Sequence, residues 1–175
     1  MSLHTITETA LINAPAERVY AILADYRNGH PHILPRKYFL SLNVEQGGSG
    51  AGTVISFTMR VMGRTQEFRA AVTEPEPGRV LVETNTPNGA VTTFTVQPSG
   101  EQQVSSLPHR RADDLRPSAG ETQCRLTIST ALQTRDGLFG PLERFLTTRA
   151  LRPIYVEELK LIAARAEGGG RAAGK

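Results

Sequence analysis

The residues best suited to acid–base chemistry gather between positions 25 and 35, in the stretch DYRNGHPHILP. Tyr26, His30 and His32 lie there together, and the whole chain has only four histidines. A phenol or an imidazole beside a carbonyl group can transfer a proton, which makes these three residues candidate catalytic groups. The glycine and two prolines of the same stretch also fit a shaped loop whose side chains bind backbone or water, so both interpretations stay open.

A metal site is not expected from the pattern of possible ligands. Zinc usually takes three or four ligands, commonly histidine, cysteine or a carboxylate. His30 and His32 flank a proline without a wider ligand motif, while Cys124 falls in a predicted strand. The other histidines, His4 and His109, lie near the N-terminus and in a polar segment. The sequence therefore predicts neither a bound metal nor another cofactor.

Length and composition indicate one ordinary globular domain. The chain has 175 residues, of which 39% are hydrophobic and 21% charged, as is usual for such a domain. Its net charge of +3 is small and spread along the chain, so no nucleic-acid-binding surface is expected. No apolar run approaches the ~18 residues that span a bilayer, and no secretory signal is recognisable. A cytoplasmic protein without an integral membrane segment is therefore expected, with its single cysteine buried and unpaired.

Hydrophobic periodicity predicts two helices separated by a run of short strands. Alternating polar and apolar residues predict strands over 5–12, 39–46, 54–62, 68–72, 79–84, 91–96 and 122–132. Asn13-Ala14-Pro15 fits the start of a first helix over 16–25. An apolar stripe at helical spacing predicts a second helix over 137–167, kinked or broken before Pro153. Short strands joined by local turns are typical of an antiparallel meander.

The expected domain boundaries follow from the same patterns. Residues 1–167 are expected to form a single domain, and residues 168–175, with the sequence GGGRAAGK, a flexible tail. Residues 98–121 are rich in proline, serine, glutamine and charge, with few apolar residues to bury. They are expected to form a mobile hairpin insertion, with a functional flap as the alternative.

Particular phrases, in their order, carry a resemblance to a known superfamily. The segment INAPAERVY at 12–20 looks like a strand that ends in a polar-Ala-Pro turn into a helix, and Asp25-Tyr26 precedes a proline-bearing loop. Gly52-Thr53-Val54, Glu76-Pro77-Gly78-Arg79 and a final helix over 138–166 follow at matching places. Over residues 3–166, apart from 98–121, the chain resembles the START-related (SRPBCC, Bet v-like) superfamily of lipid-transfer domains, plant allergens and bacterial polyketide cyclases/dehydratases. It departs from many relatives in having no tryptophan and in its long hairpin before the last strand.

The resemblance implies an α+β helix-grip fold. A curved antiparallel sheet of six to seven strands then wraps around a long C-terminal helix, with short helices after the first strand and an apolar ligand cavity inside. The residues expected to contact a ligand are Phe57, Met59, Phe68, Val72, Phe94, Leu126, Leu142, Phe145, Leu146 and Arg149. Arg60, Glu67 and Arg69 have the opposite strand parity, so they should face solvent, with Glu67 opposite Arg60 across a hairpin.

The function expected from these features is binding or transport of a hydrophobic small molecule, such as a lipid, a quinone or a polyketide-like compound. Few polar groups are needed where burial of apolar ligand surface drives binding. The alternative is an enzyme of the polyketide cyclase/dehydratase type, in which Tyr26, His30 or His32 acts as acid or base. A protein partner or a homodimer also stays open.

Overall fold

The computed structural model describes residues 1–61, 63–86, 88–99, 123–137 and 140–168. The elements, in chain order, are β1 (Ser2–Ile12), α1 (Ala16–Ala24), the short 3-10 helix η1 (His30–His32), β2 (Phe39–Gln46), β3 (Val54–Val61), β4 (Arg64–Glu76), β5 (Val80–Asn85), β6 (Val91–Pro98), β7 (Cys124–Thr134) and α2 (Gly140–Gly168).

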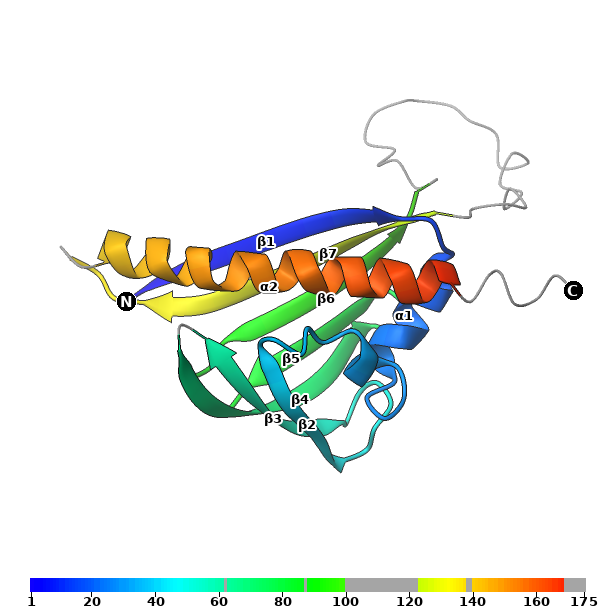
Figure 1. Ribbon diagram of the computed structural model, residues 1–175, viewed down its shortest axis with the longest axis horizontal. Helices are drawn as coiled ribbons and strands as arrows, with labels where there is room; N and C mark the ends of the chain where they lie inside the picture. Colours follow the sequence, from blue (N-terminus) through cyan, green and yellow to red (C-terminus); the bar gives the residue numbers. More distant parts are fainter. Residues whose placement is uncertain (62, 87, 100–122, 138–139, 169–175) are drawn as a thin grey trace, which may run out of the picture.

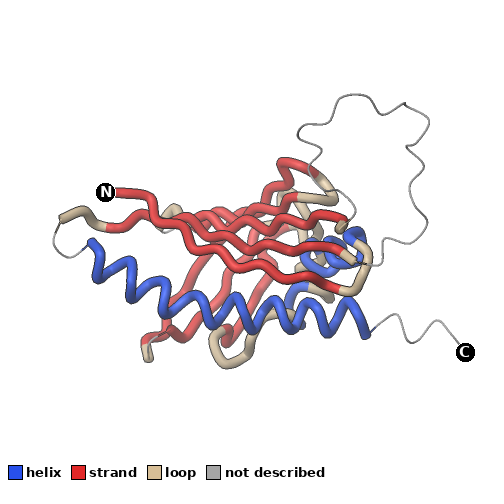
Figure 2. Tube along the Cα trace, turned by 90° about the horizontal axis from the view of Figure 1, so that it is seen from above, coloured by secondary structure: helices blue, strands red, loops and turns tan. Residues whose placement is uncertain are grey.

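Seven antiparallel strands form one curved sheet. Their order is β1-β7-β6-β5-β4-β3-β2, so the first two strands of the chain form opposite edges. In Figure 1, α2 lies alongside β1, and the sheet bends beneath the helix toward β2 and β3. Figure 2 shows the same helix running along the length of the sheet. This arrangement confirms the predicted helix-grip fold with short helices after the first strand.

Strand alternation places the apolar residues of β3 and β4 inside and the charged ones outside. Arg60, Glu67 and Arg69 are exposed, as expected from their parity. The expected pairing of Glu67 with Arg60 is wrong, because the register of the β3–β4 hairpin places Glu67 opposite Thr58. Arg69 instead forms an ion pair with Glu45, with Nε and Oε2 2.7 Å apart.

Helix α2 is continuous across Pro153, so of the two predicted outcomes at this residue, a kink or a break, the break is wrong. Side-chain hydrogen bonds to β1 and to the residue that follows it are among the contacts that hold the helix to the rest of the fold. Arg152 Nε donates to Glu8 Oε1 on β1 at 2.6 Å. Near the C-terminal end, the backbone and side-chain nitrogens of Asn13 donate to Glu167 Oε1 at 3.0 and 3.2 Å. These contacts fix α2 across the hollow of the sheet.

Two of the predicted segments lie mostly outside the part of the chain that the structure describes. Residues 100–121 of the expected insertion and 169–175 of the expected tail lie outside the described residues. The ends of β6 and β7 remain joined, because the Ser99 amide donates to the Gln123 carbonyl at 3.1 Å. In the described part of the chain, no helix is both long and apolar enough to cross a membrane.

The turn over residues 47–53 braces the loop that follows α1. The Tyr26 amide donates to the Gly48 carbonyl at 3.0 Å, and the Gly50 amide donates to the Ala24 carbonyl at 2.9 Å. Gly50 has a φ of 56°, in the left-handed region that glycine adopts without steric cost. The turn therefore depends on glycine at this position.

Replacing Gly50 by alanine should destabilise the fold more than the same change at Gly63. Both glycines have positive φ, so each alanine variant carries about 1–2 kcal/mol of backbone strain. Only at Gly50 would the new methyl group collide with the carboxylate of Glu74, whereas nothing lies within 4 Å at Gly63. We expect Gly50→Ala to lower the free energy of unfolding by about 2–4 kcal/mol in urea denaturation. A loss no larger than that of Gly63→Ala would contradict the bracing role of the turn.

Candidate functional site

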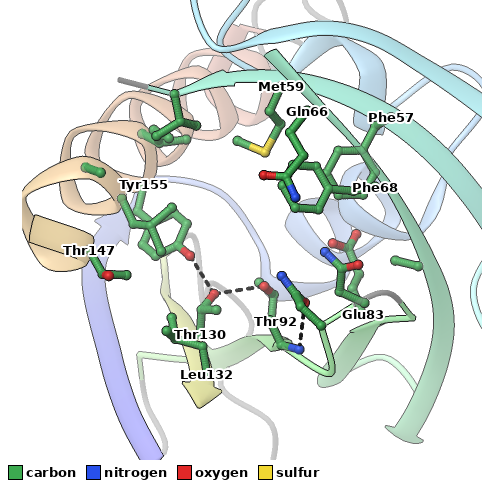
Figure 3. A pocket seen from close by; sticks show the side chains of 18 of the residues that line it. Phe57, Met59, Gln66, Phe68, Glu83, Thr92, Thr130, Leu132, Thr147 and Tyr155 are labelled. Carbon is green, nitrogen blue, oxygen red and sulfur yellow. Dashed lines mark hydrogen bonds between the residues drawn. The ribbon is translucent and has the colours of Figure 1, made fainter. Parts of the chain in front are cut away.

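A cavity of about 730 Å³ lies between α2 and the concave face of the sheet. One wall is apolar and comes from inward-facing residues of β2, β3 and β4: Phe39, Leu42, Ile55, Phe57, Met59, Val61, Phe68 and Ala70. The rings of Phe57 and Phe68 stack with centroids 5.4 Å apart, and both project into the cavity (Figure 3). Helix and sheet therefore enclose space that their own side chains leave unfilled, at a size usual for sites that bury a small organic molecule.

The cavity opens beside the N-terminal half of α2. Leu142 and Leu146 line it, yet their exposed fractions are 55% and 38%. Further along the same helix, the lining residues Ile154 and Glu158 are buried. The cavity thus runs from an exposed, apolar mouth to a buried inner end.

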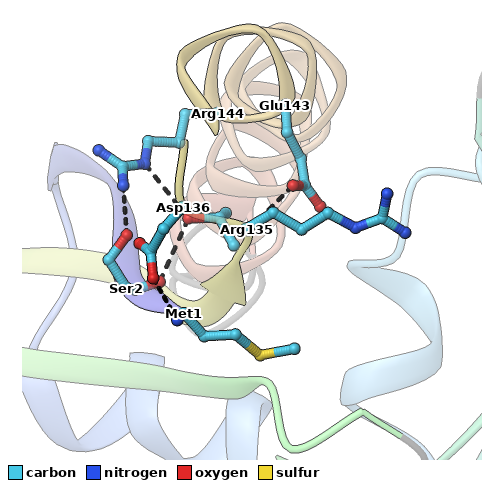
Figure 4. A network of polar contacts seen from close by, with 7 residues as sticks. Met1, Ser2, Arg135, Asp136, Glu143 and Arg144 are labelled. Carbon is cyan, nitrogen blue, oxygen red and sulfur yellow. Dashed lines mark hydrogen bonds and ion pairs between the residues drawn. The ribbon is translucent and has the colours of Figure 1, made fainter. Parts of the chain in front are cut away.

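A polar network fixes the start of α2 near this mouth. The amino group of Met1 pairs with Asp136, and Arg144 donates to the Ser2 hydroxyl (Figure 4). Arg144 Nε also donates to Thr134 Oγ1 at 3.2 Å. The network joins the beginning of β1, the end of β7 and the first turns of α2. The part of α2 that borders the mouth is therefore held to both strands.

A polar row crosses the wall opposite the phenylalanines. Glu83 on β5, Thr92 on β6 and Thr130 on β7 are register neighbours, and all three line the cavity. The hydroxyl oxygens of Thr92 and Thr130 lie 2.8 Å apart, and the Tyr155 hydroxyl donates to Thr130 Oγ1 at 2.6 Å (Figure 3). Asn85 is the next inward residue of β5 and lines the cavity as well. A ligand would therefore meet one apolar wall and one polar wall.

Tyr26 and His30 are buried beside Glu83. The Tyr26 hydroxyl donates to Glu83 Oε1 at 2.6 Å. The rings of Tyr26 and His30 stack with centroids 4.4 Å apart. His30 Nδ1 lies 2.8 Å from the carbonyl oxygen of Leu23, and since a carbonyl can only accept, Nδ1 carries a hydrogen. His30 Nε2 lies 3.6 Å from Glu83 Oε1 and forms an ion pair only when the imidazole is protonated. Two of the predicted catalytic residues thus meet at one carboxyl group.

Glu158 is a second carboxyl group at the inner end, and it is only 3% exposed. Among the described residues, no hydrogen-bond donor or basic side chain contacts it. Burial, and then the nearby Glu83 carboxylate, raise the pKa of Glu158 well above its ordinary value. Burial and Glu83 likewise raise the pKa of Tyr26. The environment of Glu158 therefore favours its protonated, neutral form over the carboxylate.

The structure brings six of the predicted ligand contacts to the cavity wall: Phe57, Met59, Phe68, Phe94, Leu142 and Leu146. Val72 and Leu126 face inward but are packed within the core, outside the cavity lining. Phe145 and Arg149 are exposed on α2. Each precedes a lining residue by one position, which turns its side chain by about 100° around the helix, toward solvent.

His32 differs from the other two predicted catalytic residues, because it is exposed whereas Tyr26 and His30 are buried. Both histidines belong to η1, in which residues two positions apart point to different sides. The structure therefore places His30 at the cavity and His32 on the surface.

The sequence patterns did not point to the following polar lining residues of the inner wall: Glu83, Asn85, Thr92, Thr130 and Glu158. A signal was present for the two carboxyl groups. Glu83 shares the strand parity of Leu81, which is fully buried. Glu158 lies four positions from both Ile154 and Ile162, on the apolar stripe of α2. A charged residue at a position that the pattern assigns to the core marks both sites.

The described residues also bear on metal and thiol chemistry. Among them, no three histidine, cysteine, aspartate or glutamate side chains gather in a way that could hold a metal ion. Cys124 is buried and unpaired, and burial raises the pKa of its thiol to about 11. A thiol with this pKa is a poor nucleophile at neutral pH.

The curved sheet, the long helix and the space between them define a helix-grip protein with an internal cavity. The sequence matches the family model described as polyketide cyclase / dehydrase and lipid transport over residues 4–167. The chain belongs to this family, which confirms the superfamily that the sequence motifs indicated. Comparison with curated protein sequences gives no match.

Solved structures share the fold over nearly the whole chain. The KanY protein, determined by NMR, is 24% identical with a TM-score of 0.73, and the match covers 95% of this chain and 99% of KanY. The Zhui aromatase/cyclase from Streptomyces sp. R1128 is 16% identical with a TM-score of 0.71, covering 99% of both chains. Ginseng major latex-like protein 151 from Panax ginseng is 11% identical with a TM-score of 0.60, covering 94% and 97%. At these identities, the likeness shows a common fold.

Proposed function

We propose that this protein binds, and thereby carries or sequesters, a hydrophobic small molecule such as a lipid, a quinone or a polyketide-like compound. The observation that carries the proposal is the cavity of about 730 Å³, whose phenylalanine, leucine and methionine side chains surround space that they do not fill. Burying apolar ligand surface there contributes about 25 cal/mol per Å². A ligand has a direct entry route, because Leu142 and Leu146 line the exposed mouth.

The test is a titration of delipidated protein with diphenylhexatriene, a neutral apolar fluorophore that brightens when it leaves water. We expect saturable binding of one probe per chain, together with a rise in the melting temperature, because a ligand that binds only the folded state stabilises it. Absence of both the fluorescence change and the thermal stabilisation would overturn the proposal.

An enzyme of the polyketide cyclase/dehydratase type is the second candidate. The observation in its favour is the convergence of Tyr26 and His30 on Glu83, in the wall that also holds Glu158 with its raised pKa. Glu158 would give its proton to a ligand carbonyl oxygen, and Glu83 or His30 would take one from the adjacent carbon, which forms an enol. Deuterium exchange into a bound ketone, lost in Glu158→Gln, would support this candidate. A ligand recovered from deuterated buffer without exchange would exclude it.

A further inference from the structure

The inner end of the cavity holds acidic groups without a matching positive charge. Glu83 and Glu158 line it, and a third glutamate, Glu143, lies nearer the mouth. Among the described lining residues, Arg135 carries the only permanent positive charge, and it is exposed near the mouth, where its amide donates to Glu143 Oε2 at 3.0 Å. His30 Nε2 lies 3.6 Å from Glu83 Oε1, but no comparable partner reaches Glu158. The wall therefore favours a ligand that brings positive charge.

One buried hydrogen-bond acceptor of this wall has no partner in the described part of the chain. Oδ1 of Asn85 is a buried acceptor with no donor in reach among the described residues. The hydroxyls of Tyr26 and Tyr155 are already used, since they donate to Glu83 and Thr130. Buried polar atoms in native proteins are nearly always paired, so an unpaired acceptor in a cavity wall points to a ligand with N–H or O–H groups.

Aromatic rings provide a second feature suited to a cation. Phe94 lines the cavity next to His30, with ring centroids 6.0 Å apart, and Tyr155 lines it from α2. Phe57 and Phe68 form the stacked pair on the far wall. The face of an aromatic ring attracts a cation, and the attraction is stronger where water is excluded.

We propose that the cavity selects hydrophobic amines, with the ammonium group beside Glu158 and the apolar part against the phenylalanine wall. This inference rests on the proposed function and names the chemical class of its ligand. An ammonium group has three donors and no acceptor, which complements the carboxyl group of Glu158 and the unpaired Oδ1 of Asn85. A neutral alcohol of the same shape has one donor and brings no charge, so it leaves more of these acceptors unpaired.

Binding of an amine should release a proton from Glu158. In the empty cavity, burial and the Glu83 carboxylate raise the pKa of this carboxyl and favour its protonated form, whereas a neighbouring cation favours the ionised form. The ammonium group keeps its own hydrogens, the Glu158 acid gives its proton to the buffer, and a carboxylate–ammonium pair results. The titratable groups around Glu158 are Glu83 on β5, Tyr26 and His30 on the loop after α1, and Tyr155 on α2.

The experiment compares naphthylmethylamine with naphthylmethanol, which differ only in the polar group. Isothermal titration calorimetry near neutral pH, in two buffers with different enthalpies of ionisation, gives both the affinity and the number of protons released. We expect the amine to bind at least about tenfold more tightly than the alcohol and to release about one proton, while the alcohol releases none. Glu158→Gln should remove both the preference and the proton release and should retain alcohol binding.

The matched control is Glu157→Gln, which alters a neighbouring glutamate of the same helix that does not line the cavity. This variant should keep the amine preference and the proton release. If the alcohol binds but the amine has no advantage in the unmodified protein, or if Glu158→Gln retains the advantage, amine selectivity is wrong and the proposed function stands. If neither compound nor diphenylhexatriene binds, the proposed function itself fails. Proton release by the unmodified protein tests the inference even if Glu158→Gln does not fold.

Discussion

Replacement of Ala150 by tryptophan should abolish binding of a hydrophobic ligand while the protein remains folded. Ala150 lines the cavity from α2, between the exposed mouth and the buried inner end. An indole group at this position would occupy space that the ligand needs, and the partly exposed backbone site can accept a larger side chain. We expect the affinity for diphenylhexatriene to fall by roughly 100-fold, equivalent to about 2.8 kcal/mol, in the fluorescence titration.

The control for this prediction is tryptophan at the preceding position. Arg149 is exposed on α2, so Arg149→Trp adds the same indole group outside the cavity. Its affinity should stay within about threefold of the unmodified protein, as expected for a surface change away from the site. Equal loss of binding in both variants would indicate that the probe binds the surface of α2, and undiminished binding in Ala150→Trp would place the ligand elsewhere.

The protein should become less stable as the pH rises above 4.5 towards the raised pKa of Glu158. In the unfolded chain this carboxyl loses its proton near its ordinary pKa of 4.5, whereas in the folded protein its pKa is raised. Between the two pKa values, the unfolded state binds fewer protons than the folded state, so the free energy of unfolding falls as pH increases. One such group gives a slope of up to about 1.4 kcal/mol per pH unit, measurable by urea denaturation.

The variant Glu158→Gln should lose this slope, because the amide is neutral in both states. Glu157→Gln should keep it, since the buried carboxyl remains. Asp25, Glu45 and Asp136 do not obscure the effect, because their pKa values are lowered. Groups of that kind contribute stability that is lost only as the pH falls through those lowered values. A slope that persists unchanged in Glu158→Gln would show that another group is responsible.

The fold could be predicted from the sequence because each strand repeats a local rule. Inward residues such as Phe57, Phe68 and Phe94 lie at alternate positions, and the structure places all three at the cavity. Pairing partners were harder to predict, as Glu67 shows, because a shift of the hairpin register changes every cross-strand neighbour. The sequence also left open whether Pro153 kinks or breaks the last helix, because tertiary contacts on both sides of the proline hold α2 together.

The polar site could be predicted only in part. Tyr26 and His30 were identified by residue type, but their distances to Glu83 depend on how the loop after α1 folds against the sheet and the turn at 47–53. The sequence of residues 25–35 alone does not show how this loop folds against the sheet. Glu83 and Glu158 occupy positions that the apolar pattern assigns to the interior, but the pattern alone does not show that these positions line a cavity.

The pairing of β1 with β7 has a consequence for how the protein forms during synthesis. Ser2 lies opposite Thr134, so the first strand cannot find its neighbour until nearly the whole sheet has left the ribosome. The strands from β2 to β6 are joined by short hairpins and can assemble from local contacts, whereas β1 must wait for a partner that is distant in sequence. Helix α2 follows β7 in the chain, so the cavity between helix and sheet forms last. A ligand in the cavity would therefore stabilise the complete fold but could not assist the earliest folding steps.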